Sequence, residues 1–175
     1  QKYSLNYSLT HKFNAKNIFN LSAYISYDDF QYNKNFGVQY RTTNFQAIYR
    51  KIHSGKVYSK WILSQGNYPS NQTDFTGIDA SVIKNNVEQF QFKNIFTLHP
   101  RTGLQFQAGI QSILYTIKPG DRLPFGTLST VLPKKLENEK GIESGIFLNT
   151  DYTSGKFQIN GGLRLSHYAF LGPKS

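Results

Sequence analysis

The sequence contains no cysteine, no methionine and no apolar run long enough for a transmembrane helix, which needs about 20 residues. The lack of cysteine excludes disulfides. It fits an extracytoplasmic compartment that does not use them, and it equally fits a chance composition. The chain also lacks a leader of charged and then apolar residues. We therefore expect either that a signal peptide has been removed or that the sequence is an internal piece of a protein.

Acidic residues are scarce, since 10 Asp and Glu oppose 20 Lys and Arg, which gives a formal net charge of +10. Such a charge raises nucleic acid as a partner. The basic residues, however, are spread singly over predicted turns and polar strand faces, whereas nucleic-acid modules combine a basic groove with stacking aromatics. We expect no nucleic-acid partner, and we interpret these residues as a solvated surface or as contacts to anionic lipid head groups. They include Lys12, Lys16, Arg50, Lys51, Lys56, Arg101 and Lys156.

Catalytic and metal-binding patterns are missing as well. Glu143 and Asp151 are eight residues apart on one predicted strand, which is about 26 Å at ~3.3 Å per residue. That distance exceeds the ~5–9.5 Å of a glycosidase carboxylate pair. No nucleophile elbow and no phosphate-binding glycine loop occur. No metal-ligand spacing exists for the histidines at positions 11, 53, 99 and 167. The sequence predicts no enzyme, no cofactor and no metal site.

What the sequence does contain is alternation of apolar and polar residues with period two, clearest between Gly141 and Gly172. This pattern predicts two β-strands, each with one apolar and one polar face. A two-residue turn at Ser154-Gly155 would close them into a hairpin. The expected cross-strand pairs are then Leu148 with Gly161, Ile146 with Leu163, Ser144 with Leu165 and Glu143 with Ser166.

The same alternation recurs along the chain and predicts an all-β fold of eight antiparallel strands in four hairpins. In the first hairpin, the expected pairs are Leu9 with Leu21, Tyr7 with Ala23 and Leu5 with Ile25. The third strand changes phase, so we expect a bulge near Thr42–Asn44. Tight turns are predicted near residues 14–16, 53–56, 99–103 and 153–155, and long loops near residues 66–85 and 118–140.

The predicted strands exceed the ~9–11 residues that cross a bilayer, and short turns at one end with longer loops at the other are typical of outer-membrane barrels. We therefore interpret the chain as part of an antiparallel transmembrane β-barrel. The apolar residues expected to face lipid are Leu5, Leu9, Leu21, Ile25, Phe90, Phe92, Phe96, Phe106, Ile110, Ile146 and Leu148.

The polar neighbours of these residues would face the barrel lumen. The lumen-facing candidates are Glu143, Arg164, Asn149, Asn160, Gln105, Gln107 and Lys93, and the extracellular-loop candidates are Asp74, Asp79, Asp121 and Arg122. In the expected register Arg164 is a diagonal neighbour of Glu143, at roughly 7–8 Å between backbones. Gly145, directly opposite Arg164, would leave room for the guanidinium to approach the carboxylate.

The segments Asn94–Pro119, Glu143–Tyr152 and Gly161–Pro173 carry motifs that resemble those of TonB-dependent outer-membrane receptors. Asn94–Pro119 is similar to a hairpin of that family with the pattern FGxxSIYHxFxPG, and Glu143–Tyr152 (ESGIFLNTDY) resembles its strand E-x-x-x-F/Y-x-x-D-E-Y. Gly161–Pro173 (GGLRLSHYAFLGP) resembles its strand xGLRYSxFxxLGP. The order and spacing of the segments also match, and Ala23–Tyr32 resembles an earlier strand. The resemblance therefore covers most of the chain.

The resemblance implies a central part of a barrel of about 22 strands, filled by a plug domain that lies outside this sequence. It further implies the outer membrane of a Gram-negative cell, and energised uptake of a scarce nutrient such as a siderophore, cobalamin or a glycan. The implied partners are outer-membrane lipid, the plug domain and remaining strands, the TonB complex acting through the plug, and the nutrient ligand. Two alternatives remain open: a small, complete eight-stranded outer-membrane barrel with a structural or adhesive role, and a soluble lipocalin-like barrel that binds a ligand.

Overall fold

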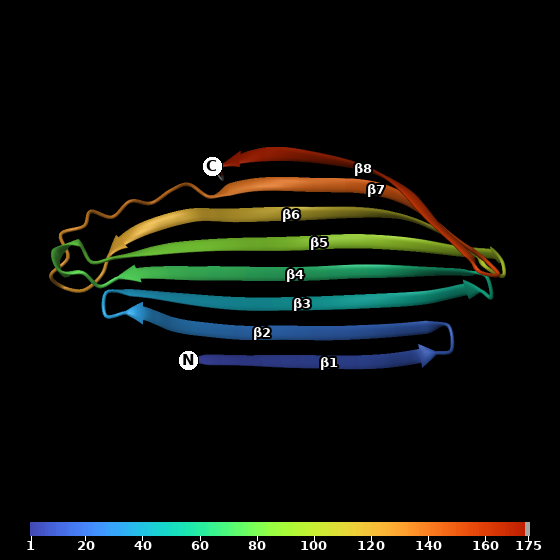
Figure 1. Ribbon diagram of the computed structural model, residues 1–175, viewed down its shortest axis with the longest axis horizontal. Helices are drawn as coiled ribbons and strands as arrows, with labels where there is room; N and C mark the ends of the chain where they lie inside the picture. Colours follow the sequence, from blue (N-terminus) through green and yellow to red (C-terminus); the bar gives the residue numbers. More distant parts are fainter. Residues whose placement is uncertain (174–175) are drawn as a thin grey trace.

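The computed structural model describes residues 1–173, which form one antiparallel sheet of eight strands in chain order (Figure 1). This arrangement confirms the prediction of an all-β fold with eight antiparallel strands. The strands are β1 (Lys2–Asn14), β2 (Asn17–Asn33), β3 (Phe36–Ser54), β4 (Val57–Asp74), β5 (Ser81–Arg101), β6 (Leu104–Pro124), β7 (Glu139–Ser154) and β8 (Phe157–Pro173).

The strands are long, from 13 residues in β1 to 21 residues in β5 and β6, whereas globular proteins usually have strands of about 5–6 residues. Within residues 1–173 the only helix is a short 3-10 helix, η1 (Gly77–Asp79). No helix in this part of the chain has the length and apolar character needed to cross a membrane. The sheet is therefore the whole scaffold of the described chain.

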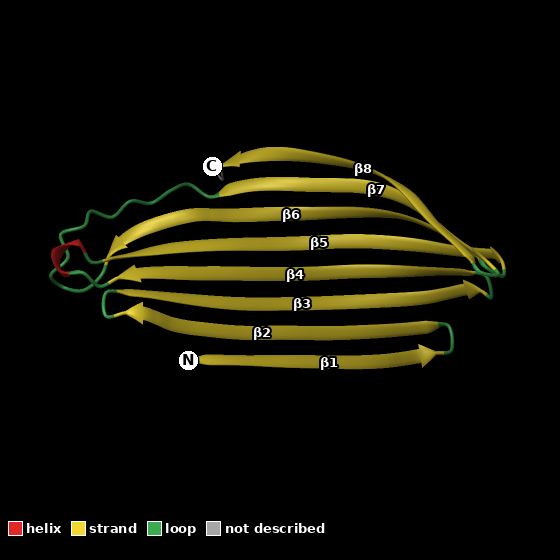
Figure 2. Cartoon of the chain, viewed as in Figure 1, coloured by secondary structure: helices red, strands yellow, loops and turns green. Residues whose placement is uncertain are grey.

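The two ends of the sheet differ (Figure 2). At the turn end, the hairpins close through residues 15–16, 55–56, 102–103 and 155–156, each within or beside a predicted turn. At the loop end, β2 and β3 are joined by residues 34–35, and the longer segments 75–80 and 125–138 connect β4 to β5 and β6 to β7.

Both long loops are shorter than the sequence predicted. β4 continues to Asp74 and β5 begins at Ser81, so most of the expected loop near residues 66–85 is strand. Likewise β6 continues to Pro124 and β7 begins at Glu139, which reduces the expected loop near residues 118–140 to residues 125–138. In the extensions of β4 and β5, polar residues occupy both faces, so period-two alternation disappears although cross-strand pairing continues. The predicted extent of these loops was therefore wrong.

The register of the first hairpin is as predicted, with Leu9 opposite Leu21, Tyr7 opposite Ala23 and Leu5 opposite Ile25. The bulge expected near Thr42–Asn44 is absent, because β2 and β3 pair through this stretch without a shift. The phase change has another cause. At the loop end, Val38 and Tyr40 lie on the opposite face from Phe45. On that face Val38 is only 4% exposed, and the Tyr40 ring lies 5.8 Å from the Phe30 ring.

The last hairpin closes one residue later than predicted. Ser154 pairs with Phe157, so the turn residues are Gly155 and Lys156 rather than Ser154 and Gly155. Gly155 has φ +56°, as the first residue of a type II′ turn requires. The register therefore shifts by two residues, which leaves every side chain on its predicted face. The observed pairs are Leu148 with Leu163, Ile146 with Leu165, Ser144 with His167 and Glu143 with Tyr168.

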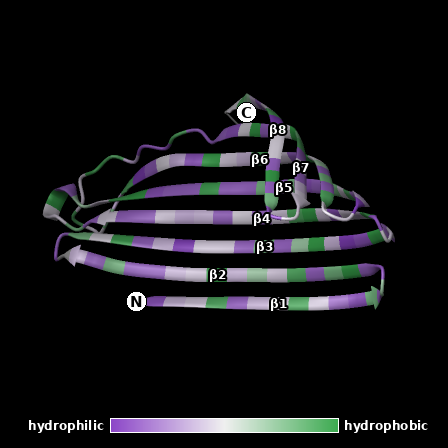
Figure 3. Cartoon of the chain, turned by 45° about the vertical axis from the view of Figure 1, so that its right-hand side comes forward, coloured by the Kyte–Doolittle hydropathy of each residue, from purple (hydrophilic) through white to green (hydrophobic). Residues whose placement is uncertain are grey.

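The register gathers the apolar residues of the strands on one side, called here the apolar face. Figure 3 shows hydrophobic and hydrophilic residues alternating along the strands. One cross-strand row of this face runs Leu9, Leu21, Ala47, Leu63 and Phe92. The 11 residues from Leu5 to Leu148 that the sequence predicts to face lipid all lie on the apolar face. The opposite side, called the polar face, carries mainly serine, asparagine, glutamine and charged residues.

The sheet is open. Within residues 1–173, β1 and β8 do not pair with each other, so each presents one free backbone edge. No second sheet packs on either face of the described chain. The apolar side chains are consequently exposed, for example Phe90 by 50%, Ile110 by 49% and Leu163 by 79%.

Candidate functional site

The polar face carries every residue that the sequence assigned to a barrel lumen. Because the strands pair in a continuous register, most of these residues fall into cross-strand rows. The rows are Lys93–Gln111–Gly145–Ser166, Gln107–Asn149–Gly162 and Gln105–Asp151–Asn160. Glu143 and Arg164 lie on either side of the first row, which passes between them.

Arg164 is the centre of the largest polar cluster. Its Nη2 atom lies 3.5 Å from Oε1 of Glu143 in an ion pair. Its Nε donates a hydrogen bond of 2.9 Å to the hydroxyl of Ser166, and its Nη1 donates one of 3.3 Å to the Gln111 side-chain oxygen. The guanidinium therefore joins β6, β7 and β8.

The ion pair forms although the predicted register was wrong. Arg164 is opposite Phe147 rather than Gly145, so the side chain extends past one more row to reach Glu143. Gly145 still provides the space that was expected of it. A Cβ atom placed there would lie 3.1 Å from Nη2 and 3.4 Å from Cζ of Arg164, closer than most Cβ contacts. A glycine at this position allows the guanidinium to lie flat on the sheet.

A second cluster surrounds Asp151, nearer the turn end. Asn160 donates a hydrogen bond of 2.7 Å to Oδ1 of Asp151, and Gln105 donates one of 3.3 Å to Oδ2. Each carboxylate oxygen thus has a neutral amide partner on a neighbouring strand. In the next row, Asn149 packs against Gly162, where a Cβ atom would overlap its side-chain oxygen.

The Phe147 ring covers the space between these clusters. It lies over Gly109 of β6, where a Cβ atom would come within 2.7 Å of the ring. The Lys93 ammonium is 5.2 Å from the ring centroid, a distance at which a cation–π attraction operates. Lys93 is therefore held on the polar face by an aromatic ring.

Gln111, Ser166, Asp151 and Phe147 also belong to this site, although the sequence alone did not identify them as candidates. The first two become visible only with the correct register, which brings them beside Gly145 in one row. Asp151 was placed on the polar face but not recognised as the acceptor for two amides. Phe147 lies opposite Gly109, and a glycine opposite a large aromatic residue is the signal in the sequence that could have indicated its role.

The loop candidates do not form one site. Asp121 is 6% exposed and lies 3.2 Å from the Lys118 ammonium, and it accepts a hydrogen bond of 3.2 Å from the backbone N–H of Leu136. Burial opposes ionisation of Asp121, but these hydrogen bonds, together with Lys118 and Lys135, outweigh it and lower the pKa of the carboxyl from its usual 3.8. Arg122 donates to the Ser81 hydroxyl at 3.4 Å, and Asp79 is exposed in η1.

Asp74 ends β4 and organises the segment that follows it. Its Oδ1 atom accepts a hydrogen bond of 2.9 Å from the backbone N–H of Thr76. Hydrogen bonds from the side chain and backbone of Thr76, with a contribution from Arg122, lower the pKa of the Asp74 carboxyl. Asp74 and Asp121 therefore hold loops in place, which is a structural task.

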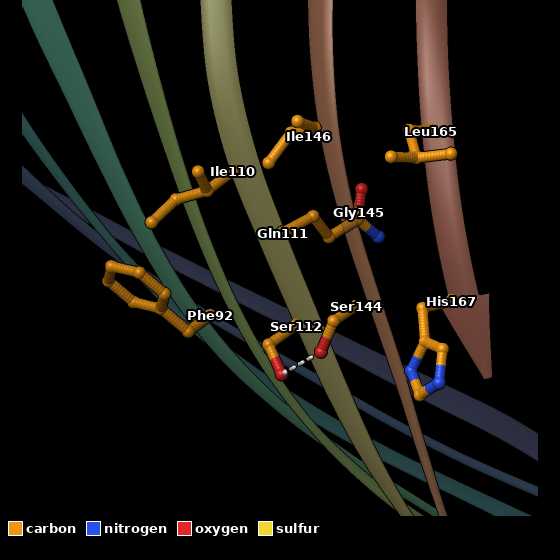
Figure 4. Close-up of a pocket in the computed structure, with 9 residues that line it drawn as sticks. All are labelled: Phe92, Ile110, Gln111, Ser112, Ser144, Gly145, Ile146, Leu165 and His167. Atoms are coloured by element: carbon orange, nitrogen blue, oxygen red, sulfur yellow. Dashed lines mark hydrogen bonds between the residues drawn. The ribbon is translucent and has the colours of Figure 1, made fainter. Parts of the chain in front are cut away.

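The apolar face also has a hollow, of about 370 Å³ (Figure 4). Its floor includes Ser112 and Ser144, whose hydroxyl oxygens are 3.3 Å apart and hydrogen-bonded. The surrounding side chains are Phe92, Ile110, Ile146, Leu165 and His167. Gln111 and Gly145 complete the lining of the hollow, which is mainly apolar.

The polar face can therefore contact a polar ligand through hydrogen bonds and ionic contacts, with the Arg164 guanidinium as its strongest donor. Groups of three or more His, Asp or Glu side chains placed to hold a metal ion do not occur among residues 1–173. No protein-family model, no curated protein and no solved structure matches this chain.

Proposed function

We propose that this chain is part of the wall of a TonB-dependent transport barrel in a Gram-negative outer membrane, with its apolar face in lipid and its polar face lining the lumen. The barrel would take up a scarce nutrient, such as a siderophore, cobalamin or a glycan. Energy would come from the TonB complex through a plug domain. The proposal joins the sequence resemblance to four properties of the sheet.

The observation that carries the membrane part of the proposal is the apolar face. Its stripes run from Phe90 to Leu98 in β5 and from Leu104 to Leu114 in β6, lengths of 9 and 11 residues. Transmembrane β-strands need about 9–11 residues. Towards the loop end the same face becomes polar, with Glu88 in β5 and Lys118 in β6. A bounded apolar belt on an uncovered sheet is what lipid would cover.

Several polar groups inside this belt have partners in the protein. The Asn94 side chain donates a hydrogen bond of 3.4 Å to the backbone oxygen of Lys60, and the hydroxyls of Ser112 and Ser144 bond each other. Lipid offers no hydrogen bonds, so polar groups in a bilayer must be satisfied by the protein. The belt meets that requirement at Asn94, Ser112 and Ser144.

The polar face suits the inside of the barrel better than the outside. In the central strands, apolar-face residues such as Leu63, Phe90 and Ile110 are exposed, while their polar-face neighbours Gln89 and Gln111 are half-buried. Crowding on one side is expected for the inner surface of a curved sheet. A soluble lipocalin-like barrel would show the opposite pattern, with the apolar residues inside.

The free edges favour a larger barrel over a small complete one. Unpaired backbone groups in lipid cost several kcal/mol each, by order of magnitude. The outer edges of β1 and β8 do not satisfy each other within the described residues, so further strands must pair with them. An eight-stranded barrel closed by this chain alone would need a β1–β8 pairing.

The faces can be tested by single-cysteine labelling, for which the absence of native cysteine in this chain is convenient. Ile110→Cys and Gln111→Cys place the thiol on opposite faces of one strand. In the assembled protein in vesicles, we expect Ile110→Cys to react with a lipid-confined maleimide and Gln111→Cys with a water-soluble one. The reverse pattern would support a soluble barrel with an apolar interior.

The transport part needs a separate measurement. We expect cells that express the protein to accumulate one of a panel of radiolabelled ferric siderophores, cobalamin or oligosaccharides, and to lose that uptake when TonB is deleted. Uptake that continues without TonB would contradict the energised mechanism while leaving the barrel intact.

A further inference from the structure

The turn end of the sheet carries a row of cations, called here the basic rim. Each of the four tight turns at this end contains or adjoins a lysine or arginine, and Lys51 lies next to the second turn. All of these side chains are exposed. The residues of the basic rim are Lys16, Lys51, Lys56, Arg101 and Lys156.

Backbone hydrogen bonds between successive hairpins hold the rim together. The carbonyl oxygen of Lys16 accepts a bond of 2.8 Å from the N–H of Ile52, and that of Lys56 accepts one of 2.7 Å from His99. In the third turn, the Gly103 oxygen accepts a bond of 2.7 Å from Thr153. Each turn is thus tied to the hairpin that follows it, and the cations are displayed along one continuous edge.

Acidic residues are nearly absent from this end. Of the 10 Asp and Glu, Asp151 alone is close to a tight turn, and it lies on the polar face with Gln105 and Asn160. None of the rim cations forms an ion pair in the part of the chain that the structure describes. At the loop end, by contrast, Lys2 pairs with Asp28 and Lys118 with Asp121.

Exposed aromatic side chains lie on the apolar face near the rim. Trp61 is 44% exposed, Phe96 44% and Phe157 77%, and the Arg101 guanidinium is 5.8 Å from the Tyr152 ring. Aromatic residues are enriched at membrane–water interfaces, with apolar residues towards the membrane interior. Exposed aromatic rings therefore lie on the apolar face within a few residues of the rim cations.

We propose that the basic rim binds the phosphates of anionic phospholipids in the leaflet at the turn end. This inference rests on the membrane orientation proposed above and adds a lipid preference for one leaflet. A Lys or Arg near an anionic membrane surface contributes about 1 kcal/mol, and rim cations without carboxylate partners retain that contribution in full. A ligand that contacts the rim and the adjoining apolar face together must have an anionic head and an apolar body, as a phospholipid has.

The single tryptophan of the chain reports on this region. Trp61 lies on the apolar face and pairs with Tyr49, which precedes Lys51 by two residues on β3. Along its own strand, Trp61 follows the turn residue Lys56 by five positions. In vesicles of phosphatidylcholine with a minor fraction of phosphatidylglycerol, either lipid can carry brominated chains that quench nearby tryptophan. The Trp61→Phe variant removes the Trp61 signal, so the difference between the two proteins isolates it.

For the wild-type protein we expect brominated phosphatidylglycerol to quench Trp61 with a relative binding constant about five-fold above that of phosphatidylcholine, the equivalent of ~1 kcal/mol. Replacing the five rim cations by glutamine should abolish this preference. The matched control removes five loop-end lysines, Lys34, Lys84, Lys134, Lys135 and Lys140, by the same substitution and should keep it. Heat-modifiable gel mobility shows that each variant is folded.

The wild-type protein also gives a test that needs no variant, because ~1 M salt shortens the Debye length to about 3 Å and should remove the preference. Equal quenching by both lipids at low salt would overturn the anionic preference while leaving the membrane orientation standing. The preference is likewise overturned if the loop-end control loses it as fully as the rim variant. Quenching of Trp61 by neither lipid would instead overturn the proposed membrane function itself.

Discussion

The two faces of the sheet differ in chemistry and in how closely their side chains pack. On the apolar face, Ile146 is 57% and Leu148 is 51% exposed. On the polar face of the same strand, Gly145 is buried and Phe147 and Asn149 are half-buried, although these positions alternate along one backbone. Around β7, polar-face side chains cover one another through hydrogen bonds and ring contacts, whereas Ile146 and Leu148 remain more than half exposed. The comparison indicates that the polar face is organised by this chain and that the apolar face depends on its surroundings.

The largest expected effect comes from exchanging the chemistry of the two faces at adjacent residues. Leu163→Arg places a charge on the apolar face, where Leu163 is 79% exposed, and a lipid-facing arginine costs ~2–4 kcal/mol at the bilayer midplane. Arg164→Leu loses an exposed ion pair worth about 0–1 kcal/mol. We expect Leu163→Arg to impair folding into lipid vesicles, measured by heat-modifiable gel mobility, and Arg164→Leu to fold. If Leu163→Arg folds normally and Arg164→Leu fails, the faces are inverted.

A smaller effect is expected from side-chain volume. Gly109→Leu on the polar face would overlap the Phe147 ring and the backbone oxygen of Asn94, and overpacking typically costs about 1–3 kcal/mol. The matched change, Ala108→Leu, adds a side chain at the preceding residue, which is exposed on the apolar face. We expect the denaturant midpoint in vesicles to fall for Gly109→Leu and to stay near wild type for Ala108→Leu. Equal losses would contradict the difference in packing.

The faces were predictable from the sequence in three of the four hairpins, because period two leaves little choice there. Once Phe90 and Phe92 are in a strand, they must share a face. The phase change in β3, by contrast, left the outward face of the second hairpin unassigned. The register of the last hairpin was not predictable in the same way. Turns at Ser154-Gly155 and at Gly155-Lys156 give registers two residues apart, and both keep every side chain on its face. The positive φ of Gly155 at the first turn position accompanies the second choice.

The candidate site was predictable in part for a related reason. The predicted Glu143–Arg164 ion pair forms although the predicted register was wrong, because an arginine side chain is long and Gly145 leaves space for it. Gln111 and Ser166 have shorter side chains, so their contacts with Arg164 could be predicted only from the correct register, and the sequence did not identify them. At the loop end, β4 and β5 extend as strands with polar residues on both faces, so sequence periodicity gives no signal there. The sequence therefore distinguishes the two faces only where one of them is apolar.

The smallest effect is expected at that boundary, where Asp121 holds the segment 125–138 against β6. Its folded pKa is below the usual 3.8. The carboxylate therefore stabilises the loop fully above the unfolded pKa, and the contribution is lost as the pH falls through the lowered value. Asp121→Asn keeps an oxygen for the Leu136 N–H but removes the attraction to Lys118.

At neutral pH we expect faster amide hydrogen exchange in residues 134–138 of the Asp121→Asn variant than in wild type. In acid below the lowered pKa the two proteins should exchange alike, and Asp79→Asn, at an exposed loop position, should match wild type throughout. A difference between Asp121→Asn and wild type that persists in acid would show that the charge of Asp121 does not hold the loop.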